Sequence, residues 1–287
     1  MGEAWTPLKV LAWTTGKFAE RGIGSARLDA EVLLAHALGT SRVGLYTGFD
    51  KPLQEEELAA YRELVRRRLA GEPVAYLVGQ KEFWSLPLRV DPRVLIPRQD
   101  TETLVEVALR RAPSAARIAD VATGSGAVAL ALAKERPGAM VVATDVSEDA
   151  LAVARANAGA LGLAVRFVAG DLLAPLAGER FDLVVGNPPY VPSGDLAGLA
   201  PEVGREPRAA LDGGPDGLAL VRRLVAAAPA ALADGGVLAL EHGFDQGEAV
   251  RALFAAAGLA DVETARDLGG NERVTSGARK TLPTPPG

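Results

Sequence analysis

The chain lacks cysteine altogether, and only two of its 287 residues are histidine. The absence of cysteine excludes disulfides, thiolate metal ligands and cysteine nucleophiles. With only His36 and His242 available, a metal centre built on imidazole ligands is not expected either. We therefore predict no metal site, and we assign both histidines to ordinary packing or surface positions.

Long apolar runs are missing as well. Hydrophobic residues make up 48% of the chain, but Arg, Glu and Asp interrupt every run before it reaches the ~20 apolar residues of a membrane-spanning helix. The first 20 residues show no basic stretch followed by an apolar core and a small-residue cleavage site, the pattern of an export signal. We expect a cytoplasmic protein that does not contact membranes.

An excess of basic residues is also absent. The net charge is −5, and aromatic residues make up only 5% of the chain. Tight, sequence-independent binding to nucleic acid needs several Lys or Arg side chains on one face. We therefore expect no direct contact with nucleic acid.

Residues 1–75 are predicted to form a small helical domain, because apolar side chains recur there at helical spacing. The clearest sets are Leu28, Val32, Ala35 and Leu38, and Leu58, Tyr61, Val65 and Leu69. The second helix opens with three glutamates (55–57) and ends with three arginines (66–68), which suits the helix dipole. The arginine run is either a nucleic-acid patch or a solvated helix end, and Glu63, one turn before Arg67, favours the solvated end.

Residues 76–100 are predicted to form a linker built around a β-hairpin. Apolar residues partly alternate between positions 76 and 90, and Pro87, Asp91 and Pro92 interrupt them, as is typical of a short hairpin. The segment 95–102, Leu-Ile-Pro-Arg-Gln-Asp-Thr-Glu, follows and leads into an amphipathic helix.

Beyond residue 112 the pattern changes to strands and helices in alternation, which predicts a parallel sheet with crossover helices. Strands are predicted at 117–121, 140–144, 165–169, 181–185 and 237–241, and helices at 127–136, 148–161, 218–232 and 247–257. Residues 262–265 and 273–276 are expected to close the sheet as an antiparallel hairpin. The tail 281–287, rich in Pro and Thr, is expected to be flexible.

A loop of small residues between the first predicted strand and helix of this sheet indicates a nucleotide site. It consists of Ala122, Thr123, Gly124, Ser125 and Gly126. Small residues let a ligand approach the backbone at the carboxyl edge of the strands. Asp145 ends the next strand, where a carboxylate can accept hydrogen bonds from both hydroxyls of a ribose.

Which nucleoside cofactor binds is left open by these residues. Gly124, Gly126 and Ala129 also fit the dinucleotide fingerprint, and a tight turn made only for packing would use the same residues. Asp171, after the third strand, either meets an adenine or caps a turn.

Asn187, Pro188, Pro189 and Tyr190 directly follow the fourth predicted strand. As a bare sequence they mark a turn, but at the carboxyl edge beside the cofactor they become a candidate reaction centre. An amide nitrogen is a poor nucleophile, so an enzyme acting on it must work by positioning. The Asn187 side-chain oxygen and the Pro188 carbonyl can each accept one N–H of a substrate amide. The prolines stiffen the loop, and the Tyr190 ring can cover the planar amide and exclude water.

With these motifs the chain resembles the release factor glutamine methyltransferases, also called the HemK or PrmC family. The resemblance covers nearly the whole sequence. It is carried by residues 76–83, 95–102, the glycine loop, Asp145, Asn187 to Tyr190, Glu206 with Pro207, Ala210 with Leu211, 213–218 and 267–274. Asn-Pro-Pro-Tyr alone is shared with amino methyltransferases of adenine, whereas the 95–98 and 206–207 segments are more selective.

The resemblance implies a Rossmann-like class I S-adenosylmethionine methyltransferase sheet (101–280), with the helical N-terminal domain (1–75) and the hairpin linker (76–100). It implies methyl transfer from S-adenosylmethionine to the glutamine of the Gly-Gly-Gln motif in class I peptide chain release factors, with both domains binding the partner. Asn187, Pro188, Pro189 and Tyr190 are then the catalytic residues. The implied cofactor residues are Ala122, Thr123, Gly124, Ser125, Gly126, Asp145, Asp171, Leu172 and Asn187.

Two positions depart from the family pattern. Ala122 stands where a first glycine is usual, and Leu172 stands where an aromatic often covers the adenine. Three alternatives stay open beside this family: an adenine methyltransferase, a nicotinamide-dependent dehydrogenase, and a non-catalytic binding module on the same fold.

Overall fold

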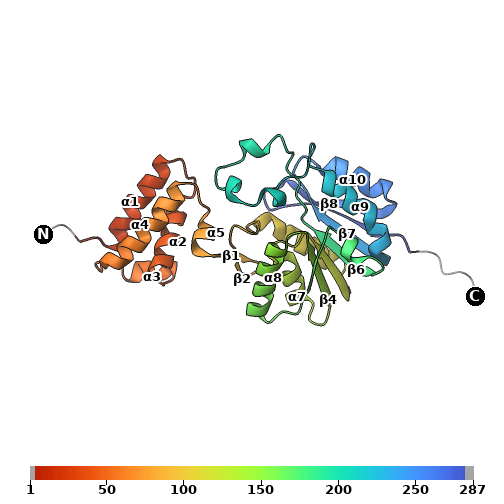
Figure 1. The fold of residues 1–287 in the computed structure, drawn as a ribbon, viewed down its shortest axis with the longest axis horizontal. Coiled ribbons are helices and arrows are strands. Elements are labelled where there is room, and N and C mark those ends of the chain that lie inside the picture. The colour runs from red at the N-terminus through yellow and green to blue at the C-terminus, as the bar shows by residue number, and fades with distance from the viewer. Residues whose placement is uncertain (1–3, 282–287) are drawn as a thin grey trace, which may run out of the picture. The chain divides into compact units, whose positions relative to one another are not determined.

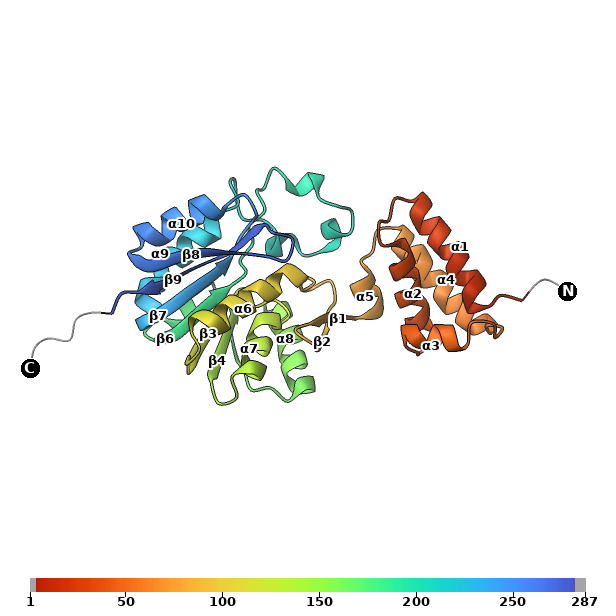
Figure 2. The ribbon, with the colours of Figure 1, turned by 180° about the vertical axis from the view of Figure 1, so that it is seen from behind.

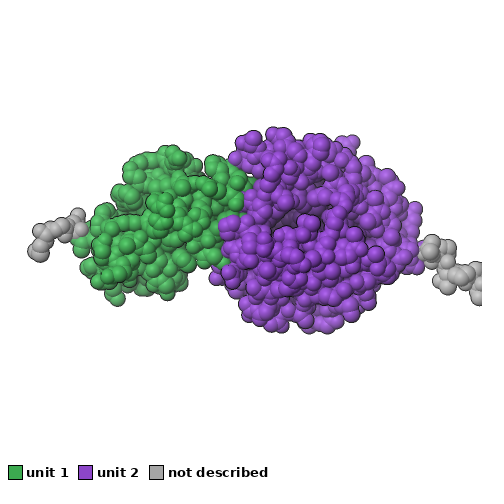
Figure 3. All heavy atoms as spheres, in the orientation of Figure 1, with its two compact units in different colours: residues 1–79, 200–205 green, residues 80–199, 206–287 purple. Residues whose placement is uncertain are grey.

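The computed structural model describes residues 4–281, and within that range no helix is long and apolar enough to cross a membrane. The chain divides into two compact units, shown in Figure 3. Unit 1 is Met1–Gly79 with Ala200–Arg205, and unit 2 is Gln80–Leu199 with Glu206–Gly287. Of the tail predicted to be flexible, residues 282–287 lie outside the described part of the chain.

Unit 1 is helical in the region that the structure describes (Figure 1). Thr6 caps the first helix through its side chain, and Pro7 occupies the first turn, where its missing N–H costs nothing. Buried leucines, valines and aromatics of α1, α2 and α4 form its core. The helices are α1 (Pro7–Glu20), α2 (Ala26–Ala37), α3 (Arg42–Thr47), α4 (Glu55–Leu69) and α5 (Val74–Val78).

The buried face of α2 differs from the predicted one. Leu28 is 46% exposed, whereas Ala30, Leu33 and Leu34 are completely buried. Because α2 packs against α1, α3, α4 and α5 at once, its buried stripe is wider than a single helical row and is displaced from Leu28. For α4 the predicted face is confirmed, since Leu58, Tyr61 and Val65 are buried.

The arginine run at the end of α4 is not the uniformly solvated helix end that the sequence favoured. Arg68 is buried, and its Nε lies 2.8 Å from Asp29 Oδ2 on α2. Glu63 pairs with Arg66, not with Arg67 as predicted, and Arg67 pairs with Glu72 beyond the helix end. All three guanidinium groups therefore meet carboxylates within their own unit.

Unit 2 is built on a sheet of seven strands in the order β5-β4-β3-β6-β7-β9-β8. Five strands run parallel, and β9 pairs antiparallel with both β7 and β8. The strands are β3 (Arg117–Val121), β4 (Met140–Asp145), β5 (Arg166–Ala169), β6 (Phe181–Gly186), β7 (Leu232–Glu241), β8 (Leu259–Arg266) and β9 (Glu272–Arg279).

Helices cover both faces of this sheet (Figure 2). Side chains alternate along each strand, so Ile118 of β3 joins the core under α6, α7 and α8, whereas its neighbour Ala119 joins the core under α9 and α10. The helices are α6 (Glu102–Arg111), α7 (Ala127–Glu135), α8 (Glu148–Leu161), α9 (Ala219–Ala231) and α10 (Gly247–Ala256). Short 3-10 turns occur at η1 (Gln99–Thr101), η2 (Ala174–Leu176), η3 (Leu196–Gly198), η4 (Val203–Arg205) and η5 (Arg208–Ala210).

The predicted α/β class and the strand–helix alternation are confirmed, with longer strands near the C-terminus than the sequence pattern indicated. β7 begins at Leu232, with a register shift against β6 between Phe181 and Leu183. The closing hairpin spans 259–279, because β8 and β9 pair beyond their apolar centres.

The predicted linker hairpin is present as β1 (Gln80–Phe83) and β2 (Leu86–Arg89). Residues 76–78, predicted as its beginning, instead belong to the helix α5. Trp84 and Ser85 form the turn with φ angles of 51° and 54°, as a two-residue hairpin turn requires. The Trp84 backbone N–H donates to Glu102 Oε1 at 2.8 Å, which fixes this turn to the start of α6.

Candidate active site

Unit 2 contains a cavity of about 410 Å³ at the carboxyl edge of its parallel strands. Parallel strands bring the loops that follow them to one edge, where ligands bind in such sheets. The loops after β3, β4, β5 and β6 all contribute, and the segments 93–95 and 207–210 close the rim. Its lining includes Ala122, Gly124, Asp145, Asp171, Leu172, Asn187 and Pro189 among the residues predicted from sequence.

The predicted glycine loop joins β3 to α7, and its residues divide into two groups. Ala122 and Gly124 line the cavity with φ angles of 60° and 56°. A side chain on Gly124 would meet no atom of the chain within 4 Å and would instead enter this open space. Ala122 is a non-glycine residue in the left-handed region, which costs about 1 kcal/mol, and its methyl group adds bulk to the cavity wall.

Thr123, Ser125 and Gly126 do not line the cavity and instead hold the loop in place. Thr123 Oγ1 donates to Asp120 Oδ2 at 2.6 Å, and the Ser125 carbonyl accepts from Asn157 Nδ2 at 2.9 Å. A Cβ on Gly126 would come within 3.2 Å of Ala154 Cβ, so this glycine permits the close approach of α8.

Asp120 lies beneath the loop and is 1% exposed. One oxygen, Oδ2, accepts from the Thr123 hydroxyl and from the Ala129 N–H, the latter at 3.1 Å. Burial raises the pKa of the Asp120 carboxyl to about 7, and these two hydrogen bonds oppose the rise. The loop therefore rests on a buried acid that has no cationic partner among the residues described.

Asp145 ends β4 where the sequence predicted a ribose ligand. Its Oδ2 accepts from Gly124 N and its Oδ1 from Ser147 N, both at 2.9 Å. Burial raises the pKa of this carboxyl, and the backbone N–H groups act against that rise. Each carboxylate oxygen has a second lone pair, so Asp145 can fix the glycine loop and still accept from a diol.

Asp171 and Leu172 both line the cavity, but Asp171 also has a partner outside it. Its side chain is half-exposed and pairs with Arg223 on α9. Leu172, at φ 51°, and exposed Val146 both contribute apolar side chains to the cavity lining.

The Asn187–Tyr190 loop leaves β6 at the same edge of the sheet. Asn187 and Pro189 line the cavity, whereas Pro188 and Tyr190 are not part of its lining. Asn187 Nδ2 donates to Thr101 Oγ1 at 3.2 Å. The Asn187 side-chain oxygen accepts no hydrogen bond from the residues described.

Tyr190 is turned towards the protein interior. Its hydroxyl donates to Glu241 Oε1 at 3.2 Å, and its carbonyl accepts from Gln246 Nε2 at 2.9 Å. Burial and the Glu241 charge both raise the pKa of Tyr190, so its hydroxyl stays protonated at neutral pH. The tyrosine is anchored at its hydroxyl end, which was not predicted.

Glu241 and Thr101 are site residues that sequence reasoning missed. Glu241 is the last residue of β7 and is 1% exposed, and Thr101 is 4% exposed. Thr101 lies within the segment 95–102, singled out from sequence without a role. The rule that selected Asp145, an acid at the carboxyl end of a parallel strand, applies equally to Glu241.

Glu206, which the sequence singled out without a role, connects the segment 206–207 to the segment 95–98. It is buried, accepts from the Ile96 N–H at 3.0 Å, and forms an ion pair with Arg98. Residues 93–95 and Pro207, Ala209 and Ala210, which line the cavity, are close in sequence to this contact. The selective motifs 95–98 and 206–207 are therefore two halves of one structural clamp.

These residues fit an adenosine-containing cofactor. The open space in front of Gly124 leaves room for the methionine end. The Asp145 carboxylate can accept from a ribose, and the apolar side chain of Leu172 can contact a base. The described residues contain no group of three or more His, Cys, Asp or Glu that could hold a metal ion.

Comparisons with known proteins identify the family. The family models for a PrmC N-terminal domain and a methyltransferase small domain match residues 9–79 and 99–202. A release factor glutamine methyltransferase of Geobacter sulfurreducens is 52% identical over 276 residues, covering 96% of this chain and 97% of that protein. The chain belongs to the release factor glutamine methyltransferases. The Escherichia coli K12 protein of that name is 46% identical, with 88% of this chain and 92% of that protein covered.

The resemblance given from sequence is thereby confirmed, as is the methyltransferase class. The cofactor is S-adenosylmethionine. The nicotinamide cofactor that Gly124, Gly126 and Ala129 left open is therefore excluded. Among solved structures, a methyltransferase of Pyrococcus furiosus shares the fold, with a TM-score of 0.53, 19% identity, and 76% of this chain and 98% of that one covered.

The raised pKa of Asp120 predicts a pH-dependent stability. The folded carboxyl, with a pKa of about 7, keeps a proton that the unfolded chain releases near pH ~3.9. Its stabilising contribution is therefore complete below about pH 4 and is lost as the pH rises through about 7. Asp120→Asn retains an acceptor for Thr123 and Ala129 but does not titrate. We expect the difference in melting temperature, variant minus wild type, to increase as the pH rises from about 4 to about 7. Differential scanning calorimetry at several pH values measures it.

Asp182→Asn provides the matched control for this measurement. Asp182 also accepts two backbone N–H groups, those of Ala116 and Arg117, but lies at the start of β6, away from the glycine loop. An equal trend in both variants would show that the buried site beneath the loop is not the origin of the effect.

Proposed function

We propose that this protein transfers a methyl group from S-adenosylmethionine to the side-chain amide nitrogen of the glutamine in the Gly-Gly-Gln motif of class I release factors, in the cytoplasm. The observation that carries the proposal is the loop after β6, where Asn187 faces the cofactor cavity with its amide oxygen available. Family membership supports the same substrate.

The Asn187–Tyr190 loop acts on the substrate by orientation. Asn187 Oδ1 and the Pro188 carbonyl accept no hydrogen bond from the residues described, so both can accept the two N–H groups of a planar amide. Held in this way, the substrate amide nitrogen faces the cofactor cavity. Its fixed position relative to the methyl group then replaces a bimolecular encounter between the two. Pro188 and Pro189 are buried and restrict the backbone of the loop.

The bound cofactor would supply a sulfonium-activated methyl group and leave as the neutral thioether S-adenosylhomocysteine. The new bond joins that methyl carbon to the glutamine nitrogen, and one amide proton passes to solvent. Asp145, Gly124 and Leu172 would hold the cofactor. Tyr190, anchored through its hydroxyl, would place its ring as a wall that excludes water from the amide.

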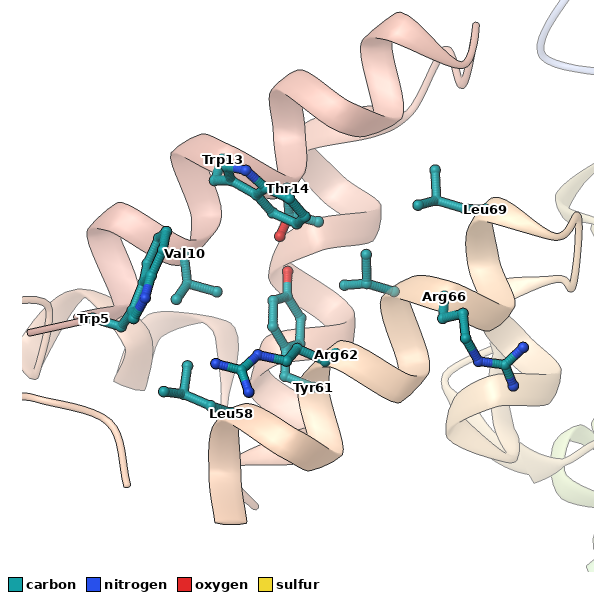
Figure 4. Close-up of a pocket in the computed structure, with 10 residues that line it drawn as sticks. Trp5, Val10, Trp13, Thr14, Leu58, Tyr61, Arg62, Arg66 and Leu69 are labelled. Atoms are coloured by element: carbon teal, nitrogen blue, oxygen red, sulfur yellow. The ribbon is translucent and has the colours of Figure 1, made fainter. Parts of the chain in front are cut away.

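We further propose that unit 1 supplies a docking surface for the release factor. A cavity of about 340 Å³ opens between α1 and α4 (Figure 4). Trp13 and Trp5, 50% and 43% exposed, lie along it, and its lining also includes Leu58 and Tyr61. Exposed tryptophans beside an apolar floor are typical anchor points of protein interfaces, and Arg62 and Arg66 give the groove a polar rim.

The test of the reaction uses the purified full-length protein, S-adenosylmethionine labelled in its methyl group, and a purified release factor. We expect one label on the Gly-Gly-Gln glutamine, located by mass spectrometry of the digested product. A release factor with that glutamine replaced by alanine should remain unlabelled. Label that persists after the replacement, or label on adenine of added DNA, would point to a different acceptor.

Asn187→Ala and Asp145→Ala should separate the two halves of the site. Loss of the Asn187 acceptor removes an interaction with the reacting amide, so we expect kcat to fall about 10²-fold or more with cofactor affinity nearly unchanged. Asp145→Ala should mainly weaken cofactor binding. Kinetics with the release factor and calorimetric titration with S-adenosylmethionine measure the two effects. Weaker cofactor binding with intact turnover in Asn187→Ala would contradict its role.

Trp13→Ala tests the docking surface. Removal of a central aromatic anchor should raise KM for the intact release factor about tenfold or more, with kcat unchanged. A short Gly-Gly-Gln peptide, which lacks the rest of the partner, should be methylated equally by wild type and variant. Leu8→Ala is the matched control, because Leu8 is also on α1 and 52% exposed but does not line the cavity. Equal effects of both substitutions would contradict a specific role of this groove.

A further inference from the structure

The orientation of the Asn187 side chain is decided by a hydroxyl from a distant part of the sequence. Asn187 Nδ2 donates to Thr101 Oγ1, although 86 positions separate the two residues. If the Asn187 side-chain amide were flipped, its NH₂ group would face the NH₂ group of the substrate amide, and two donors would oppose each other. The proposed reaction therefore needs Thr101 to act as an acceptor and not as a donor towards Asn187.

A threonine hydroxyl can donate or accept, so something must fix its direction. Thr101 Oγ1 has one hydrogen, and the Glu241 carboxyl is next to it: the Thr101 hydroxyl is the strongest of the contacts that favour ionised Glu241. Glu241 Oε2 is buried and accepts no hydrogen bond from the residues described, so this oxygen is free to receive the Thr101 hydrogen. An ionised carboxylate accepts only, so a Thr101 hydrogen directed to it leaves the Thr101 oxygen to accept from Asn187.

The same carboxyl also holds the other end of the loop. Glu241 Oε1 accepts from the Tyr190 hydroxyl at 3.2 Å. One buried acid at the end of β7 thus contacts, directly or through Thr101, both the first and the last residue of the Asn-Pro-Pro-Tyr motif. Neither Glu241 nor Thr101 lines the cofactor cavity, so their influence on the reaction must pass through the loop.

We infer that Glu241 is a positioning residue for methyl transfer, which acts through Thr101 to keep the Asn187 oxygen directed at the substrate amide and through the Tyr190 hydroxyl to hold the ring. This inference rests on the proposed function, because it assumes that Asn187 accepts from the substrate. The active form is the carboxylate, since a protonated Glu241 could donate to Thr101 and reverse the direction of the chain of hydrogen bonds.

The charged and titratable groups around Glu241 come from three elements. Tyr190 follows β6, Arg273 is on β9, and Asp100 is in η1 next to Thr101. Arg273 favours the ionised carboxyl and Asp100 disfavours it, but burial is the largest influence and raises the pKa of Glu241 to about 7. Because the ionised form is the working one, kcat should rise with pH through about 7 and then level off.

The experiment measures kcat for the intact release factor as a function of pH in the full-length protein. Glu241→Gln should lower the kcat reached at high pH about tenfold, because the Asn187 amide is then no longer held in one orientation. It should also abolish the rise of kcat through about pH 7. Thr101→Val, which removes only the hydroxyl, should give a similar loss in kcat. Thr101→Ser retains the hydroxyl and should keep most of the activity.

Two further measurements assign the effect to positioning. The Kd for S-adenosylmethionine should be unchanged in Glu241→Gln and Thr101→Val, because neither residue borders the cavity. In Asp120→Asn, kcat should still rise with pH through about 7, whatever its value at high pH. Asp120 also has a pKa near 7, but it lies beneath the glycine loop and is hydrogen-bonded to Thr123 and Ala129, not to Thr101 or Tyr190.

Several outcomes would overturn the inference. Unchanged kcat and an intact rising limb in Glu241→Gln and Thr101→Val would do so while leaving the proposed function standing, provided that wild type methylates the glutamine. A loss of kcat that merely follows a matching loss of cofactor affinity would show a general structural role. Wild type that does not methylate the glutamine at all would refute the proposed function and this inference together.

Discussion

Acidic side chains at the carboxyl ends of parallel strands hold the site in shape. Asp120 near the end of β3 accepts hydrogen bonds from the glycine loop and α7, Asp145 at the end of β4 accepts from the same loop, and Glu241 at the end of β7 accepts from Tyr190. Loops carry few apolar contacts of their own, so they need such polar anchors to keep one conformation. The glycine loop and the Asn187–Tyr190 loop are therefore each fixed to the sheet by carboxyl groups.

This arrangement has a cost in stability. A carboxylate taken out of water loses its hydration, and hydroxyl and backbone donors replace it only in part. The pKa values near 7 of Asp120 and Glu241 express that imbalance. Glu206 is placed differently, because its buried carboxylate meets the Arg98 guanidinium directly. Strain of this kind is concentrated where the loops must be held for function.

The surfaces of the two units suit different ligands. Unit 2 has a polar cavity edge where small residues, a carboxylate and an amide converge, which suits a cofactor and one planar substrate group. Unit 1 has an open apolar groove with two exposed tryptophans, which suits a larger protein surface. An acceptor as weak as an amide gains little from acid–base chemistry, so binding energy from a wide surface is well used for holding it in position.

The sequence by itself determined the α/β class and placed the glycine loop, Asp145 and the Asn187 loop at strand ends, because each depends on local spacing. The family came from the resemblance of its motifs. Only the tertiary structure separated the loop residues Ala122 and Gly124, which border the cavity, from Ser125 and Gly126, which pack behind it. It alone showed that Arg68 is buried against Asp29 and that Thr101 meets Asn187 across 86 positions. Periodicity reports which face of an element is apolar within a few residues, whereas the partner of a polar side chain is decided by which distant elements the core packs together.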